Sequence, residues 1–136
     1  MIETLRDHRG ILQWTRDPRW VRAYWMYGAP KGTVRGEHAH RTTTRLIVPL
    51  QGSCVLSLDE GTGPGVSLLV GRGVGVTVLP MRWTRLTDFS EDAIILCLAD
   101  KPYDPEEVIG DYAAWLSEVS RLWIPSAGNF LGEPGV

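Results

Sequence analysis

The sequence predicts an all-β fold, a sandwich or barrel of short strands, followed by one C-terminal helix. Short apolar segments recur at roughly ten-residue spacing, and turns rich in Gly and Pro separate them. After residue 103 the apolar residues switch to the spacing of a helix. In a chain of 136 residues we therefore expect a single domain over 1–136, with a barrel at about 7–103, a helix at about 105–122 and a loose tail at 123–136.

The expected strands follow from the apolar runs and the turns between them. Glu60 to Gly65 is the clearest loop in the chain. The run at 46–50 looks like a strand buried on both faces, in which Pro49 marks a bulge or an end. In order, strands are expected within 7–16 after an initial turn, at 20–27, from the histidine-containing segment to Leu50, and at 54–59, 66–70, 74–79, 83–88 and 93–99.

The helix is predicted by both its start signal and its period. Asp104 suits the N-cap, Pro105 the first helical position and Glu107 the third. Apolar residues then recur at helical spacing, which predicts one amphipathic helix over about 105–122. These apolar residues are Val108, Ile109, Tyr112, Trp115, Leu116 and Val119.

Composition and charge exclude several classes of function. The formal net charge is −2, so the chain lacks the basic field that nucleic acid binding requires. No apolar run reaches the length of a membrane span, and the N-terminus lacks a signal-peptide pattern. We therefore expect neither nucleic acid nor a membrane as partner. Cys54 and Cys97 stand singly in apolar runs, which favours buried free thiols in a reducing cytoplasm over a disulfide.

Two histidines one residue apart are the main candidates for chemistry. On a strand, His38 and His40 point to one face and Ala39 to the other. Surface histidines without a role and a metal site are the alternatives. We favour general acid/base catalysis, because the unperturbed pKa of histidine lies nearest neutrality and the ring can both accept and return a proton.

The spacing around these histidines resembles the first cupin motif. Metal-binding cupins carry Gly, His, His, Glu and Gly where this chain has Gly32, His38, His40, Arg45 and Gly52. The ligand histidine of the second cupin motif is replaced in the same way, by Arg85. A guanidinium does not ligate a metal and repels one. The resemblance therefore implies a cupin (jelly-roll) barrel and argues against a metal in it.

Further candidates lie near the histidines in the sequence. Tyr24 is either a core aromatic or a proton-transfer group. Arg35, Arg45 and Arg85 are either solvated surface residues or groups that bind an anionic substrate. Trp83 is either part of the core or a surface on which a base or sugar stacks.

These motifs together resemble the sugar-nucleotide 3,4-ketoisomerases, cupin-fold enzymes that act on dTDP-4-keto-6-deoxyglucose. The most specific element is Arg35-Gly-x-His38-Ala-His40, which resembles the family's Arg-Gly-x-His-Ala-His. The likeness covers most of residues 7–115. It also rests on Asp7-x-Arg9-Gly10-x-Leu12, Arg22-Ala-Tyr24, Gly52-Ser53, Leu58-Asp59-x-Gly61, Trp83 and Tyr103-Asp104.

The resemblance implies an isomerase without metal or redox cofactor. A histidine at the His38 position removes the C3 proton of the 4-keto sugar, an enediol forms, and a proton returns at C4. His40 and Tyr24 assist proton transfer, and Arg35 lies near the nucleotide phosphates. The resemblance also implies a homodimer that exchanges N-terminal strands.

The chain departs from the family at two places of interest. A Gln is usual where Arg45 stands, and the family's Asp-Tyr-Ile-Arg reads Glu107-Val-Ile-Gly110 here. The alternatives to an isomerase are a non-catalytic cupin that binds a nucleotide sugar, a metal-dependent cupin dioxygenase, and a dTDP-sugar epimerase on the same fold.

Overall fold

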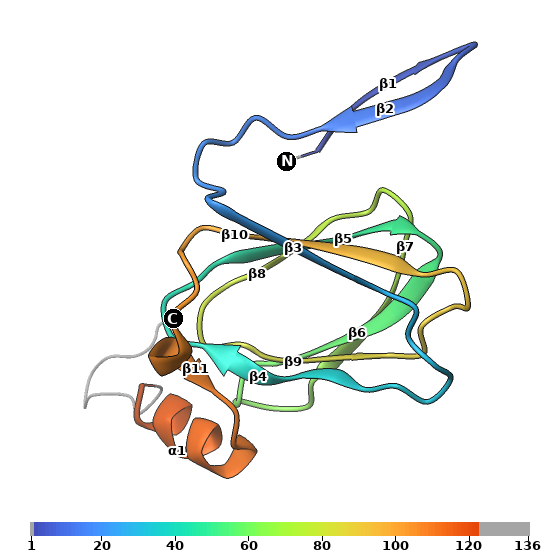
Figure 1. Ribbon diagram of the computed structural model, residues 1–136. Coiled ribbons are helices and arrows are strands. Elements are labelled where there is room, and N and C mark those ends of the chain that lie inside the picture. Colours follow the sequence, from blue (N-terminus) through green and yellow to red (C-terminus); the bar gives the residue numbers. More distant parts are fainter. Residues whose placement is uncertain (1, 123–136) are drawn as a thin grey trace.

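The computed structural model describes residues 2–122, which form two facing β-sheets, a hairpin and a helix (Figure 1). The four-stranded sheet has the order β3-β10-β5-β8, and the five-stranded sheet has the order β11-β4-β9-β6-β7. Strands bordering one another are antiparallel throughout. The bounds are β3 Arg22–Tyr27, β4 Arg35–His40, β5 Arg45–Gln51, β6 Ser53–Asp59, β7 Val66–Gly71, β8 Val76–Val78, β9 Trp83–Thr87, β10 Ile94–Ala99 and β11 Val108–Ile109.

The main core lies between the two sheets. Ile47, Leu56 and Ile95 are each at most 1% exposed and pack together there. Each sheet turns alternate side chains inward, as the period of a strand dictates. This is the two-layer arrangement that a cupin barrel requires, and it confirms the predicted fold class of an all-β barrel with a C-terminal helix.

A second cluster lies on the outer face of the five-stranded sheet. Helix α1 (Tyr112–Leu122) covers this face, as Figure 1 shows below the barrel. Trp115 is fully buried there and its indole N–H donates to the Met81 carbonyl at 3.2 Å. Ala39 of β4 belongs to the same cluster. The helix is therefore packed against the back of the strand that carries the two histidines.

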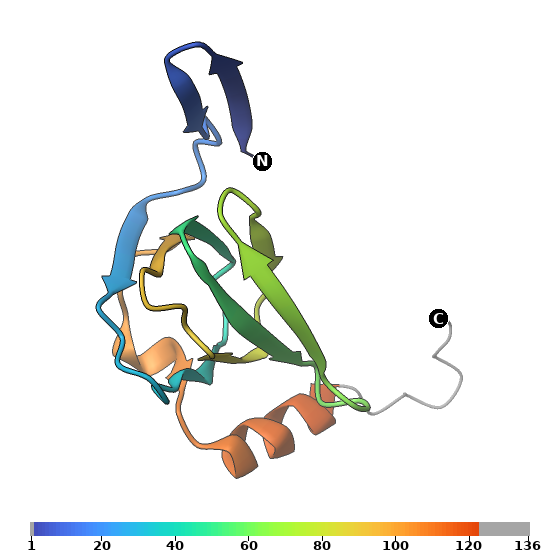
Figure 2. The same ribbon diagram turned by 90° about the vertical axis from the view of Figure 1, so that its right-hand side faces the viewer.

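An N-terminal hairpin stands away from the barrel. Among the described strands, β1 (Glu3–Asp7) and β2 (Gly10–Trp14) pair only with each other, and they project above the sheets in both views (Figures 1 and 2). Several of its apolar side chains are exposed, among them Leu12 at 61%. The hairpin therefore offers apolar surface that the rest of the described chain leaves uncovered.

The predicted strands from residue 20 onward appear with ends that differ by a few residues, except that the strand expected from the histidines to Leu50 is two strands, β4 and β5, which belong to different sheets. A register shift opposite Pro49 confirms the expected bulge in β5. Strand β1 was not predicted, and the first predicted strand is confirmed as β2. Cys54 and Cys97 are buried free thiols, as expected.

The predicted helix over 105–122 is wrong in its first third. A short 3-10 turn, η1 (Pro105–Glu107), is followed by β11, and α1 begins only at Tyr112. Asp104 caps η1, since its side chain accepts a hydrogen bond from the Glu106 N–H at 3.0 Å. Val108 and Ile109 are β-branched and pair with β4, so tertiary pairing overrides their helical spacing. The tail predicted at 123–136 lies outside the described residues.

Over residues 2–122, no helix has both the length and the apolar character needed to span a bilayer.

Candidate active site

A cavity of about 280 Å³ lies between the sheets, at the side where β3 forms the edge of the four-stranded sheet and β4 lies next to β11, the edge strand of the five-stranded sheet. It contains two of the predicted catalytic side chains, Tyr24 and His38, and two of the predicted arginines, Arg35 and Arg45. The other lining residues are Trp25, Met26, Tyr27, Gly36, Ile47, Thr84, Leu86 and Cys97.

Strand β4 brings the two histidines together, as its alternation predicts. Their ring centroids are 5.0 Å apart and the ring planes meet edge to face at 71°. Ala39 between them is fully buried in the cluster behind the sheet. A bulge precedes His38, with φ of +85° at Gly36 and +52° at Glu37. A Cβ at Gly36 would lie 3.0 Å from the Thr84 carbonyl oxygen, so glycine fits there.

His38 is held with one nitrogen engaged and the other available. Its Nδ1 lies 2.8 Å from the Gly36 carbonyl oxygen. A carbonyl oxygen only accepts, so Nδ1 carries the proton and Nε2 carries the lone pair. Burial, and then the charge of Arg45, lower the pKa of His38. The ring is therefore neutral at neutral pH, and Nε2 is a proton acceptor.

His40 lies behind His38 and pairs with Glu107 of η1. Its Nδ1 is 2.9 Å from Glu107 Oε2, and the two side chains are only 6% and 12% exposed. Burial, together with Arg45, lowers the pKa of His40 to about 4 even though Glu107 opposes this. Burial acts to raise the pKa of Glu107, but hydrogen bonds from Thr43 and His40 overcome this effect and lower it to about 2. A neutral imidazole therefore donates to an ionised carboxylate.

Arg45 is a buried cation in the wall of the cavity. It is 3% exposed, and its Nη2 approaches Thr84 Oγ1 at 3.5 Å. Its Nε has no hydrogen-bond partner within residues 2–122. Burial lowers its pKa, but a guanidinium stays charged at neutral pH. A buried cation with an unpaired donor, beside two neutral imidazoles, repels divalent metal ions and attracts an anion or an oxygen that gains negative charge.

Tyr24 and Arg35 complete this cavity from two strands. Burial raises the pKa of the Tyr24 phenol, so it stays protonated, with Arg45 and Cys97 close to it. Arg35 begins β4 and is exposed while lining the cavity. The cavity therefore holds a base, a phenol and a buried cation inside, and a second cation toward solvent.

Three predicted residues do not line this cavity: His40, which lies behind His38, and Trp83 and Arg85. Trp83 and Arg85 lie on the outer face of β9 and line a separate groove with Tyr112 and Glu37. Trp83 packs edge to face on Tyr112, and Arg85 is 3.7 Å from Glu37. The expectation that Arg85 occupies an inward ligand place is wrong by one residue. The neighbouring Thr84 points inward, because side chains alternate along a strand.

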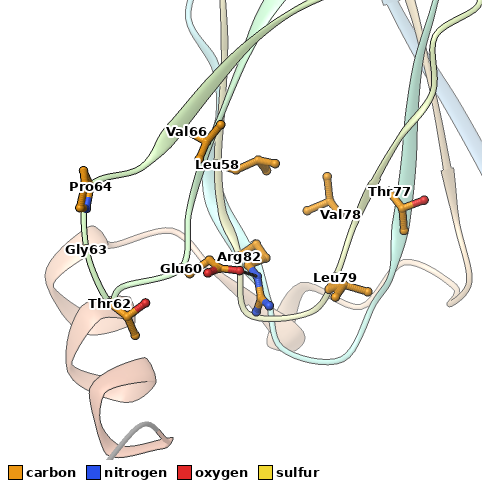
Figure 3. A pocket seen from close by; sticks show the side chains of 10 residues that line it. All are labelled: Leu58, Glu60, Thr62, Gly63, Pro64, Val66, Thr77, Val78, Leu79 and Arg82. Carbon is orange, nitrogen blue, oxygen red and sulfur yellow. Dashed lines mark ion pairs between the residues drawn. The ribbon is translucent and has the colours of Figure 1, made fainter. Parts of the chain in front are cut away.

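A larger cavity, of about 550 Å³, lies at the opposite side of the barrel between β7 and β8 (Figure 3). Leu58, Val66 and Val78 line its apolar part. Its charged residues, Glu60 and Arg82, form an ion pair with each other at 3.1 Å. No histidine or tyrosine of residues 2–122 lines it. The β3–β4 cavity is therefore the better candidate for proton-transfer chemistry, although it is smaller.

The sequence interpretation missed three residues at the site. Glu107 was assigned to a helix start, Cys97 to the core, and Thr84 was not considered. The partners of Glu107 lie 64 to 67 residues away in the sequence, so no local pattern links them.

Comparison with known proteins gives one consistent result. The family model described as "FdtA: WxcM-like, C-terminal" matches residues 2–120. TDP-4-oxo-6-deoxy-alpha-D-glucose-3,4-oxoisomerase of Aneurinibacillus thermoaerophilus is 30% identical over 107 residues, which cover 79% of this chain and 77% of that protein.

Solved structures agree with the family model. WlaRA, a TDP-fucose-3,4-ketoisomerase from Campylobacter jejuni, is 25% identical with a TM-score of 0.81, covering 90% of this chain and 98% of that one. A 3,4-ketoisomerase from Helicobacter canadensis is 27% identical with a TM-score of 0.82, covering 88% and 96%.

Proposed function

Because this chain belongs to the WxcM-like family of sugar 3,4-ketoisomerases, we propose that it is an isomerase converting dTDP-4-keto-6-deoxyglucose to a dTDP-3-keto-6-deoxyhexose. Such a product supplies a carbonyl at C3 for later amination in deoxyamino-sugar biosynthesis. The observation that carries this proposal is the neutral His38, whose Nδ1 is fixed by the Gly36 carbonyl and whose Nε2 is a proton acceptor in the cavity.

The reaction moves two protons and leaves the overall composition unchanged. His38 takes the proton from C3, and the electron pair of that bond forms the C3=C4 bond of an enediol. The carbonyl oxygen at C4 gains the released electron pair and takes a proton. A proton then returns to C4 while the hydroxyl at C3 loses its own, which leaves a ketone at C3. No redox cofactor enters this balance.

The other cavity residues have roles that follow from their charge. The C4 oxygen gains negative charge as the C3 proton leaves, and the buried guanidinium of Arg45 stabilises it. Tyr24, protonated and in the same wall, donates toward the sugar oxygens. His40 supports His38 in proton transfer. Arg35, exposed at this cavity, binds the diphosphate of the nucleotide.

The chain works as a homodimer that exchanges its N-terminal hairpins. Support comes from the apolar side chains that the hairpin and β3 leave exposed, including Ile11 at 50%, Leu12 at 61% and Trp25 at 60%. Trp25 also borders the cavity, so a partner's hairpin seated there closes the site from solvent. The buried free thiols suit a reducing compartment such as the cytoplasm.

The test follows the sugar itself. The protein is incubated with dTDP-4-keto-6-deoxyglucose in deuterated water and the sugar is followed by proton NMR. We expect a 3-keto species with deuterium at C4, and its coupling constants give the configuration there.

A matched variant separates catalysis from binding. His38→Asn should abolish turnover while leaving the affinity for dTDP within a few-fold of the parent. Retained turnover would refute the role of His38. Tight dTDP binding by the parent with no label at C3 or C4 would point to a non-catalytic nucleotide-sugar-binding cupin instead.

A further inference from the structure

We propose that Glu107 is a positioning residue for the isomerisation, which fixes His40 as the Nδ1–H tautomer and thereby keeps His40 Nε2 unprotonated beside His38. This inference rests on the proposed function. Glu107 and His40 both lie outside the cavity lining, and Glu107 reaches the histidine pair through its hydrogen bond with His40 Nδ1.

The carboxylate of Glu107 is fully used by donors from β4 and the segment after it. Oε2 accepts from His40 Nδ1 at 2.9 Å and from Thr43 Oγ1 at 2.6 Å. Oε1 accepts from Thr43 Oγ1 at 2.8 Å and from the Thr42 N–H at 3.2 Å. An ionised carboxylate has no proton to donate, so the hydrogen between it and His40 belongs to Nδ1. A neutral ring then carries its lone pair on Nε2.

Backbone hydrogen bonds also fix the position of Glu107. Its carbonyl accepts from the Arg41 N–H at 2.8 Å, and the next residue, Val108, pairs with His40 across β11 and β4. The Glu106 N–H donates a hydrogen bond to the Asp104 carboxylate, which caps the turn that carries Glu107. Both partners of the His40–Glu107 pair are therefore fixed on rigid, mutually paired elements, as a positioning contact requires.

The tautomer matters because the isomerisation transfers two protons. One moves from C3 to C4 and the other from the C3 hydroxyl to the C4 oxygen. His38 Nε2 accepts the first, and a second acceptor is needed close by. The ring of His40 lies behind His38, 5.0 Å from it and outside the cavity lining, and it can serve as that acceptor only if its Nε2 is unprotonated.

The charged and titratable groups around His40 define how it responds when it takes a proton. Arg45 from β5 and His38 from β4 oppose the charged ring, and Glu107 from η1 favours it. Removing the carboxylate therefore leaves His40 with cationic or neutral neighbours only. Glu107 controls both where the ring proton sits and how readily a second one is accepted.

The first experiment reads the tautomer directly in the unaltered protein, by two-dimensional nitrogen-15 NMR of the histidine rings near neutral pH. We expect His40 to show a protonated Nδ1 and an unprotonated Nε2. A protonated Nε2 would overturn the inference, and this result is independent of whether the protein turns over any keto sugar.

The second experiment measures Glu107→Gln against Glu106→Gln. The control removes the same charge one residue earlier, from an exposed side chain. For Glu107→Gln we expect kcat to fall at least about tenfold. The upper bound on this loss is roughly 10⁴-fold, the loss seen when the aspartate of a Ser-His-Asp triad is replaced by asparagine. KM should change by less than about threefold, and the NMR signature of the Nδ1–H tautomer should weaken.

The control variant should keep the parent kcat, KM and tautomer. A Glu107→Gln protein that keeps the parent kcat with an altered tautomer would refute the proposal. Equal losses in both variants would refute it as well. If neither the parent nor the variants turn over the sugar, the proposed function is refuted. The NMR result then still decides whether Glu107 fixes the Nδ1–H tautomer of His40.

Discussion

Acid should destabilise this protein through His40, and the size of the effect follows from its pKa. The perturbation is a change from about pH 7 to about pH 4.5. In the folded chain burial holds the pKa of His40 at about 4, against its ordinary value of 6.5. The unfolded chain therefore binds a proton more readily than the folded chain across this window. Stability contributed by the neutral ring is present above about pH 6.5 and is lost as the pH falls toward 4.

The loss is large enough to measure. The difference between the folded and unfolded pKa of His40 determines the effect. Between about pH 7 and pH 4.5, this one ring lowers the free energy of unfolding by about 2 kcal/mol. Glu107 acts in the same direction, but its pKa of about 2 and ordinary value of 4.5 place most of its contribution below this window. Domains of this size are stable by roughly 5–15 kcal/mol, so the change is a substantial fraction.

The assay is urea unfolding of the parent, His40→Gln and His8→Gln at both pH values and one protein concentration. Gln stays neutral at every pH and still donates to Glu107. His40→Gln should therefore lose about 2 kcal/mol less than the parent on acidification. His8 is exposed in the hairpin turn, so His8→Gln should follow the parent. Equal losses in the parent and His40→Gln would refute the reasoning that burial keeps His40 neutral.

Two other predictions concern the cavity cation and the hairpin. Arg45→Gln removes a charge that lowers the pKa of both His38 and His40, so both pKa values should rise and the acid limb of the kcat/KM profile should move to higher pH. An unmoved acid limb would contradict the position of Arg45 beside these rings. Leu12→Ser combined with Trp14→Ser should convert the proposed dimer to a monomer in light scattering, because both residues expose apolar surface on the hairpin. Leu69→Ser, on the exposed β7 edge, is the matched control and should stay dimeric.

The sequence allowed the barrel and the histidine pair to be predicted because both depend on local periodicity. Alternation along 35–40 places His38 and His40 on one face, and the structure confirms this despite the bulge at Glu37. Strand β1 was missed because its sequence, Glu3 to Asp7, has few apolar residues and pairs only with β2. Nothing in its own pattern distinguishes it from a polar terminus.

The sequence predictions are wrong where a residue's structure depends on contacts with residues distant in the sequence. Val108 and Ile109 fit a helical period, and only their pairing with β4 makes them a strand. The match to the second cupin motif puts Arg85 at a ligand position and so predicts that it faces the cavity. In the structure Thr84 lines the cavity and Arg85 lines the outer groove. Glu107 has no sequence signature as a partner of His40, since only the fold brings them together.

The burial of Ala39 has a consequence for engineering this protein. It is fully buried against Trp115 and Val119, while the imidazoles on either side of it point to the opposite face of β4, where His38 lines the cavity. Because protein interiors are close-packed, a change of volume behind the sheet is felt by the strand itself. A directed-evolution library restricted to the helix side of β4 therefore adjusts the placement of the two imidazoles while every substrate-facing side chain keeps its identity. Variants with altered rates are thus accessible from positions that a cavity-centred library never samples.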